Sequence, residues 1–164
     1  MIPFCGFDRC LIDSNGRVKL SPRVLADFAA DGSDPVLHCL PEGALGVYPE
    51  KAFLAMRGSA EHSAERAGES FVARRTMRRF GAMSQSGAVS PQGRLTIPPY
   101  FREYAGLKEN APAVVVGVEI GIEIWAPERW EKEQERIREH MAEKDRREMD
   151  ADLAMEHETR REER

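Results

Sequence analysis

The chain has 164 residues, 41% of them hydrophobic, and a formal net charge of −4. This length suits one ordinary domain, or two half-size units that must pack together to bury enough surface. The composition excludes a membrane-spanning helix, since no stretch of about 18 apolar residues occurs. The N-terminal segment lacks the basic and apolar regions of a signal peptide, so we expect a cytoplasmic protein.

The charge is divided unevenly along the chain. From Pro127 onward there are 10 basic and 14 acidic residues, which leaves 14 basic and 14 acidic residues before it. The body is therefore neutral overall, and nucleic-acid binding there would depend on local clusters of basic residues. The three cysteines, an odd number in a chain without an export signal, predict reduced thiols.

The first third of the chain predicts a β-hairpin, followed by a helix, two strands and another helix. Strands are expected over 7–13 and 17–20, joined by a tight turn at Asn15-Gly16, where both residues tolerate positive φ. The later elements are a helix from Pro22, strands over 36–40 and 45–48, and a helix from Pro49.

Two segments join this part to the next. Residues 58–68 are small and polar and predict a loop, whereas 71–80 predict a helix. That helix would carry a basic face of four arginines at i,i+4 spacing, namely Arg74, Arg75, Arg78 and Arg79. This face could bind phosphate groups, or it could be a solvated face that pairs with carboxylates of the tail or of a neighbouring subunit.

The second half repeats the first and adds a tail. The expected elements are a strand over 83–90, a turn at 91–93, a return strand over 94–97, a helix from Pro98-Pro99 to Gly106, and strands over 114–118 and 122–125. From Pro127 we expect a charged helix with favourable i,i+4 pairs at Glu128–Lys132, Glu143–Arg147 and Glu156–Arg160. Its apolar residues are too sparse for a coiled-coil seam, so a solvated helix that frays well before Arg164 is predicted.

A gapless repeat with an offset of 77 residues accounts for this order. The segment 13–22 (DSNGRVKLSP) corresponds to 90–99 (SPQGRLTIPP). The same offset places Val47-Tyr48 on Ile124-Trp125, Phe53 on Trp130, and Val36-Leu37 on Ala113-Val114. Anchored ends with equal spacing predict two copies of one small unit.

Several short motifs follow one another in a specific order. They are the opening Phe4-Cys5-Gly6, a D-x-x-G-R motif at 13–17, and the segments GRLTIPP at 93–99, FREYAGL at 101–107, EIW at 123–125 and ERW at 128–130. In order and spacing they resemble the MraZ family of bacterial transcriptional regulators, which are built from two swapped-hairpin units of the SpoVT/AbrB type. The resemblance covers about residues 2–130.

The resemblance implies an α+β fold of two tandem SpoVT/AbrB-like swapped-hairpin β units with short helices, plus a charged C-terminal helix. The expected bounds are 1–57 for the first unit, 58–82 for a loop and basic linker helix, 83–130 for the second unit and 131–164 for the tail. It also implies a ring-shaped homo-oligomer that binds double-stranded DNA at short tandem repeats upstream of the division and cell-wall gene cluster. Such a protein would be nucleoid-associated, with no cofactor, no membrane partner and no small-molecule substrate.

The residues predicted to contact DNA are Arg17, Lys19, Asn15 and Arg94, and those predicted to shape the two turns are Asp13, Gly16 and Gly93. Arg17 and Lys19 would lie on one face of their strand, since alternate residues point to the same side. A two-stranded ribbon fits the major groove, where an arginine can bind guanine O6 and N7 together.

Arg17 also has a purely structural interpretation, as a partner that Asp13 holds across the turn. Arg94 repeats the position of Arg17, but Ser90 stands where a second Asp would be. An arginine without a carboxylate partner is not explained by pairing, which favours DNA contact at both positions.

Two departures from the family pattern keep a second hypothesis open. Ser90 replaces an Asp, and Cys5 replaces a basic residue after the opening Phe4. The same fold could therefore serve as an oligomeric protein-interaction scaffold that does not bind DNA. A salt-dependent gel shift on the region upstream of its own gene would separate the two hypotheses.

Neither catalysis nor metal binding is predicted. The sequence has no G-x-S-x-G motif, no glycine-rich phosphate loop and no metal-spaced histidine set, and His62-Ser63 has no evident third partner. Four residues could be considered as zinc ligands: Cys5, Cys10, His38 and Cys39. Their spacing is poor for a tetrahedral site, because neighbouring residues on a strand point to opposite faces. We therefore expect buried or unused thiols.

Overall fold

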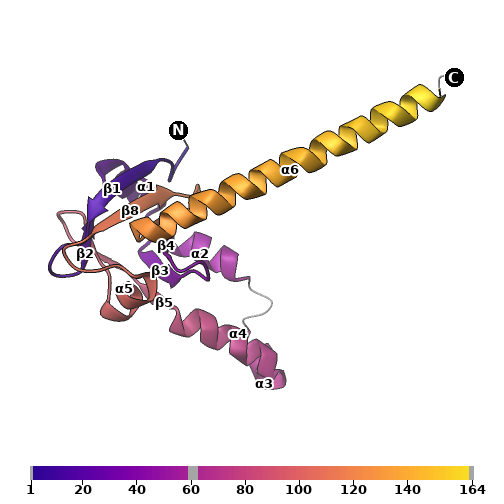
Figure 1. Ribbon diagram of the computed structural model, residues 1–164. Helices are drawn as coiled ribbons and strands as arrows, with labels where there is room; N and C mark the ends of the chain where they lie inside the picture. The colour runs from indigo at the N-terminus through magenta and orange to yellow at the C-terminus, as the bar shows by residue number, and fades with distance from the viewer. Residues whose placement is uncertain (1, 59–62, 163–164) are drawn as a thin grey trace. The chain divides into compact units, whose positions relative to one another are not determined.

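The computed structural model describes residues 2–58 and 63–162, and Figure 1 shows their arrangement as a ribbon. The chain forms two compact units, Met1–Pro127 and Glu128–Arg164. The elements of the first unit are β1 (Phe7–Leu11), β2 (Arg17–Lys19), α1 (Pro22–Asp31), β3 (Pro35–Cys39), β4 (Leu45–Pro49), α2 (Glu50–Arg57), α3 (Ala64–Glu69), α4 (Phe71–Ala82), β5 (Ser84–Ser86), β6 (Ala88–Val89), β7 (Arg94–Thr96), α5 (Pro99–Ala105), β8 (Pro112–Gly117) and β9 (Ile122–Trp125). The last helix, α6, spans Pro127–Glu162. The predicted α+β fold with tandem hairpin units is confirmed.

The strands of the two copies are interleaved. One antiparallel sheet has the order β1-β8-β9-β4-β3-β5, and a second sheet has the order β2-β7-β6. Strand β1 of the first copy pairs with β8 of the second, and β5 of the second copy pairs with β3 of the first. Each copy therefore supplies a strand to its counterpart, and both lie in one compact unit. The bounds of the individual repeat units given above stay a prediction.

The pairing between the copies is symmetric. Strands β2 and β7 run antiparallel with Val18 opposite Leu95, two residues that are 77 apart. Gly46 of β4 lies opposite Glu123 of β9, again 77 residues apart. Beside the first pair, the same hydrogen bond is made in both directions, from Leu20 N–H to the Gly93 carbonyl at 2.9 Å and from Ile97 N–H to the Gly16 carbonyl at 3.0 Å. The sequence repeat is therefore expressed as a pseudo-two-fold relation between the copies.

One strand departs from the gapless repeat. Val36 pairs with Tyr48, whereas the partner of Trp125 is Val114. Tyr48 and Trp125 are 77 residues apart, but Val36 and Val114 are 78 apart. The predicted match of Val36-Leu37 with Ala113-Val114 was therefore wrong by one residue. The cause is the segment from the start of α5 to β8, which is one residue longer than the segment from the start of α1 to β3.

One hydrophobic core serves both copies. Val18 of β2, Leu95 of β7 and Ile124 of β9 are fully buried in it, and helices α1 and α5 add Phe28 and Phe101. Because the residues at the centre of β2 and β7 point inward, their neighbours on each strand point outward. The core thus determines which residues of the two turns face solvent.

Local sequence signals explain the ends of the first helix. Ser21 precedes α1, and its Oγ accepts a hydrogen bond from the Val24 N–H at 3.4 Å. Pro22 fits the first turn, where a backbone N–H would have no helical partner. Gly32 ends α1 with φ of 75°, a left-handed conformation that glycine adopts without strain.

The hairpin regions differ in detail from the sequence-based expectation. Strand β1 ends at Leu11, two residues before the predicted end, because Asp13 already belongs to the turn. Of Asn15 and Gly16, only Gly16 has a positive φ. The strand expected over 83–90 is interrupted at Gly87, which separates β5 from β6.

The predicted loop over 58–68 was wrong for its last residues. Ser63 caps helix α3, since its Oγ accepts a hydrogen bond from the Arg66 N–H at 3.1 Å. Small residues that suggested a loop therefore form a helical turn behind a serine cap. Residues 59–62, which include His62, lie outside the described part of the chain.

The charged tail is one continuous helix through Glu162. The predicted fraying well before Arg164 was therefore wrong for the residues described. The predicted Glu143–Arg147 ion pair forms, and Lys144–Glu148 adds a second i,i+4 pair at 3.9 Å. Such pairs, together with good helix-forming residues, support a solvated helix. Within residues 2–58 and 63–162, none of the helices combines the length and the apolar character that crossing a membrane requires.

His38 joins the sheet to the linker helix. Its ring is stacked on Phe80 of α4, with centroids 5.2 Å apart, and tilted against Phe53 of α2 at 5.6 Å. Its Nδ1 lies 2.8 Å from the Ser84 hydroxyl, and the residue is only 6% exposed. Burial lowers the pKa of His38, and the positive charge of Arg79 lowers it further. The imidazole is therefore favoured in its neutral form in the folded chain.

This environment predicts a loss of stability in mild acid. The unfolded chain takes up the His38 proton near its ordinary pKa of about 6.5, whereas the folded chain takes it up only at lower pH. Stability is thus present above about pH 6.5 and declines as the pH falls toward the folded-state pKa. We expect the melting temperature to fall from pH 7 to 5, and the fall to be smaller in His38→Gln. An equal fall in both proteins would contradict this role.

Candidate nucleic-acid interface

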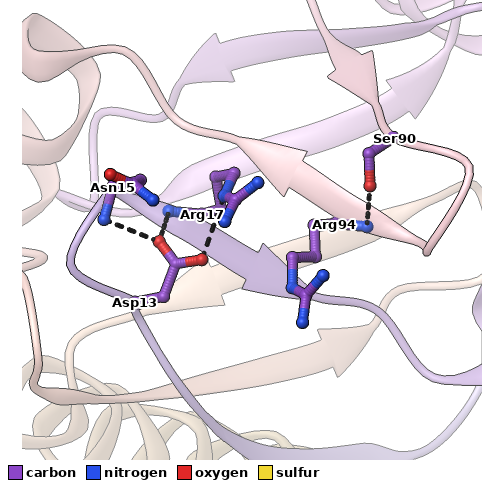
Figure 2. Close-up of polar contacts among 5 residues, drawn as sticks. All are labelled: Asp13, Asn15, Arg17, Ser90 and Arg94. Carbon is purple, nitrogen blue, oxygen red and sulfur yellow. Dashed lines mark hydrogen bonds and ion pairs between the residues drawn. The ribbon is translucent and has the colours of Figure 1, made fainter.

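The first turn is closed by the carboxylate of Asp13 (Figure 2). Its Oδ1 accepts hydrogen bonds from the backbone N–H groups of Asn15 and Arg17, both at 2.9 Å, and its Oδ2 accepts one from Arg17 Nε at 3.0 Å. Gly16 completes the turn by donating its N–H to the Asp13 carbonyl at 3.0 Å. One carboxylate therefore shapes the backbone and holds the arginine side chain.

The same hydrogen bonds keep Asp13 ionised. The backbone N–H of Arg17 contributes most to lowering the pKa of Asp13; partial desolvation opposes it, and Asn15 N–H and the Arg17 guanidinium lower it further. Both side chains are 33% exposed, so the pair lies at the surface. Asp13 binds only Nε, and the two terminal nitrogens of Arg17 have no hydrogen-bond partner among the described residues. Those nitrogens are the pair that a guanine edge can accept.

The second turn has the same backbone but a different anchor. Ser90 N–H donates to the Arg94 carbonyl and Gly93 N–H to the Ser90 carbonyl, both at 2.9 Å. The Ser90 Oγ accepts from the Arg94 backbone N–H at 3.2 Å, as Asp13 Oδ1 does in the first turn. A hydroxyl cannot form an ion pair, and Figure 2 shows the Arg94 guanidinium pointing away from Ser90. Ser90 therefore replaces the turn-forming part of an aspartate but not its hold on the arginine.

The two turns present one outward face. In the pairing of β2 with β7, Arg17 lies opposite Thr96 and Lys19 lies opposite Arg94. These four residues flank the buried pair at the centre of the two strands and are half-buried or exposed. Asn15 is exposed at the tip of the first turn. The structure thus brings three cations, predicted from two distant segments, onto one two-stranded ribbon.

Sequence reasoning missed the residues that close on the turn glycines. A Cβ added to Gly16 would lie 2.5 Å from Arg102 Nε, and one added to Gly93 would lie 2.5 Å from a methyl group of Leu25. Leu25 and Arg102 are 77 residues apart, so the contact is the same in both copies. Arg102 is held in place, because its Nε donates to the Ile97 carbonyl at 2.9 Å. The repeat offset was the signal that could have identified this pair.

The cysteines lie in surroundings that do not favour metal binding. Burial, assisted by the charge of Asp8, raises the pKa of Cys10 to about 11, and burial also raises the pKa of Cys39. Zinc binds the thiolate form, which both shifts disfavour. No group of three or more potential ligands comes together within residues 2–58 and 63–162.

Comparison with known proteins identifies relatives along most of the chain. A family model described as "MraZ protein, putative antitoxin-like" matches residues 88–152. The transcriptional regulator MraZ of Desulforapulum autotrophicum is 31% identical over 144 residues, which cover 88% of this chain and 94% of that protein. The protein of the same name from Lachnoclostridium phytofermentans is 33% identical over 147 residues, covering 85% and 96%. That of Thermus thermophilus is 32% identical over 126 residues, covering 77% and 83%.

The tight approach of Arg102 makes Gly16 a sensitive position. Gly16→Ala must adopt a positive φ, which costs about 1–2 kcal/mol for a residue with a Cβ. It must also displace Arg102 from the Ile97 carbonyl, which adds about 1 kcal/mol for the broken hydrogen bond. We expect a clear decrease in the denaturant midpoint, measured at one fixed protein concentration.

Gly32→Ala is the matched control. Gly32 has nearly the same φ, 75°, but an added Cβ would meet nothing within 4 Å. It should therefore carry the conformational cost alone and be the less destabilised variant. Equal midpoints for the two variants would show that Arg102 moves aside freely and does not brace the turn.

Proposed function

This chain belongs to the MraZ family, and from that premise we propose that it is a transcriptional regulator that binds double-stranded DNA by sequence. The resemblance inferred from the motifs is confirmed by the comparisons, whose named members are transcriptional regulators. The single observation that carries the proposal is the outward face of β2 and β7, where Arg17, Lys19 and Arg94 lie together.

The shape of this face suits the major groove of DNA. An antiparallel two-stranded ribbon fits that groove, and its outward side chains reach the base edges. Arg17 would bind guanine O6 and N7 through its two terminal nitrogens, while Asp13 holds Nε and limits the freedom of the side chain. Lys19 and Arg94 would contact phosphates or a second base, and Asn15 at the tip would contact an adjacent base.

Under this proposal Asp13, Gly16 and Gly93 act on the turns rather than on DNA. Gly16 and Gly93 have φ of 72° and 81°, which lets each chain reverse without strain. Asp13 supports the first turn through three hydrogen bonds. The asymmetry of the anchors makes Arg17 the better oriented of the two arginines.

We further infer that several copies assemble into a ring that binds short tandem repeats in front of the division and cell-wall gene cluster. Strand β1 lies at one edge of the larger sheet, and its Phe7 and Leu11 are 46% and 64% exposed. Exposed edges with apolar side chains favour pairing with another chain. Several weak contacts on one duplex would then act together, so avidity supplies the affinity. Such a regulator would be found in the cytoplasm, on the nucleoid.

The binding experiment centres on Arg17. Arg17→Ala should weaken binding to a duplex from upstream of the gene by about 1–3 kcal/mol for each bidentate guanine pair that it removes, or roughly 5- to 150-fold. Arg17→Lys keeps the charge but cannot fork onto guanine, so it should lose discrimination against a scrambled duplex while keeping salt-dependent binding. Arg94→Ala should lose less, since Ser90 does not orient that side chain. A gel shift at several salt concentrations measures all three.

Circular dichroism and oligomer mass serve as the controls for these variants. If Arg17→Ala binds like the wild type, this ribbon does not read DNA, and an interaction scaffold of the same fold becomes the better explanation. If it unfolds or dissociates, the Asp13–Arg17 pair is structural.

Assembly can be tested separately from DNA binding. Multi-angle light scattering should give a mass several times the 18.5 kDa of one chain. Leu11→Lys places a charge on the exposed edge of β1 and should lower that mass, because charged edge residues oppose strand pairing. A monomer at micromolar concentration would exclude the ring.

A further inference from the structure

Helix α4 has two different sides. Ala73, Met77 and Phe80 recur at i, i+4 and i+7 and form the packed side, with Ala73 only 7% exposed. The basic face predicted from the sequence lies on the opposite side, and all four of its members are at least partly exposed: Arg74, Arg75, Arg78 and Arg79. The i,i+4 spacing sets them in two rows with a rise of about 6 Å between successive residues.

The positive charge of this face is not neutralised. Arg74 Nη1 donates to the Ala67 carbonyl at 2.9 Å, and the Arg75 guanidinium lies 5.4 Å from the centroid of the Phe71 ring. Neither contact removes charge, since a carbonyl and an aromatic ring are uncharged. Among the residues that the structure describes, no carboxylate lies within ion-pairing distance of the four guanidinium groups.

The face is fixed within the same unit as the reading turns. Phe80, on the packed side of α4, stacks on His38 of β3 and lies 6.3 Å from the ring of Phe53. Ser70 caps the other end of the helix by accepting a hydrogen bond from the Ala73 N–H at 3.2 Å. The chain then continues directly into β5 and the turn that carries Arg94, as Figure 1 shows. Four cations are thus held on a rigid element rather than on a loop.

We propose that the outward face of α4 is a second DNA-binding surface, which contacts backbone phosphates while the β2–β7 ribbon contacts bases. This inference rests on the proposed function, because the phosphates belong to the duplex that the ribbon would read. Arginine is well suited to phosphate, since its planar fork donates two hydrogen bonds to one group. Contacts of this kind carry no sequence information and set affinity and orientation.

Two other partners fit the face less well. The tail helix of a second copy is acidic overall, but its charges alternate in sign and pair with each other, as in Glu143–Arg147 and Lys144–Glu148. A membrane surface would need a larger apolar area than Phe71 and Val72 expose on this short helix. Uncompensated charge of one sign favours a dense polyanion.

The test replaces all four arginines of the face by glutamine in the full chain. Binding is measured for the upstream duplex and for a scrambled duplex of equal length, over a series of salt concentrations. The slope of log K against log salt should become shallower by about 0.9 for each phosphate that is no longer neutralised, or roughly 3–4 per DNA-bound subunit. Affinity should fall about tenfold or more at low salt for both duplexes alike, because phosphate contacts are shared by all sequences.

A matched variant removes four exposed arginines of the tail helix, Arg138, Arg146, Arg160 and Arg161, and so lowers the net charge equally. It should leave a slope much closer to that of the wild type. Arg17→Ala provides the opposite pattern, a loss of preference for the upstream duplex with most of the slope retained. If no variant or wild-type protein prefers the upstream duplex, the proposed function fails, while the slope on the scrambled duplex still tests α4.

Three results would overturn the inference. The first is an unchanged slope in a variant with normal circular dichroism and mass. The second is a lower oligomer mass with an unchanged slope, which would assign the face to a neighbouring copy. The third is binding of the wild type, but not of the variant, to vesicles of anionic phospholipid while the DNA slope is unchanged. If the fourfold variant does not fold, the pairs Arg74→Gln/Arg78→Gln and Arg75→Gln/Arg79→Gln each test half of the predicted change.

Discussion

The pairing of β2 with β7 is the contact on which the rest of the first unit depends. It places Val18 against Leu95 at the centre of the core and ties each turn glycine to the other copy through a backbone hydrogen bond. Each copy contributes only three residues to this ladder, too few for a stable hairpin alone. The two copies therefore form a sheet only together, and the position of each turn is set by the other.

This dependence also explains why the candidate DNA-binding residues come together. Burial of alternate residues in β2 and β7 directs Arg17, Lys19 and Arg94 outward, whatever their own preferences. The turns then differ through one substitution. A carboxylate at position 13 supports both backbone and guanidinium, whereas the hydroxyl at position 90 supports the backbone alone. A symmetric scaffold thus carries two arginines with unequal freedom.

Much of this arrangement could be predicted from the sequence, because the repeat carries its own register marks. The Gly-Arg pairs and the prolines fix the turns and the helix starts in both copies. The register of β8 could not be predicted, because residues 113–116 are Ala-Val-Val-Val and a shift of one residue still leaves an apolar side chain at each position. Arg102 escaped notice for a different reason. Its contact with Gly16 spans the two copies and has no local signal.

The exchange of strands has a consequence for how the chain folds. Phe7, near the start, pairs with Val116, so the larger sheet cannot be completed until most of the unit has left the ribosome. Contacts between such distant residues form slowly, since a long loop must close before any pairing rewards it. Until β8 has been made, β1 exposes two large apolar side chains, and the same strand on another nascent chain is an equally good partner. Exchange between neighbouring copies during synthesis therefore competes with closure within one chain.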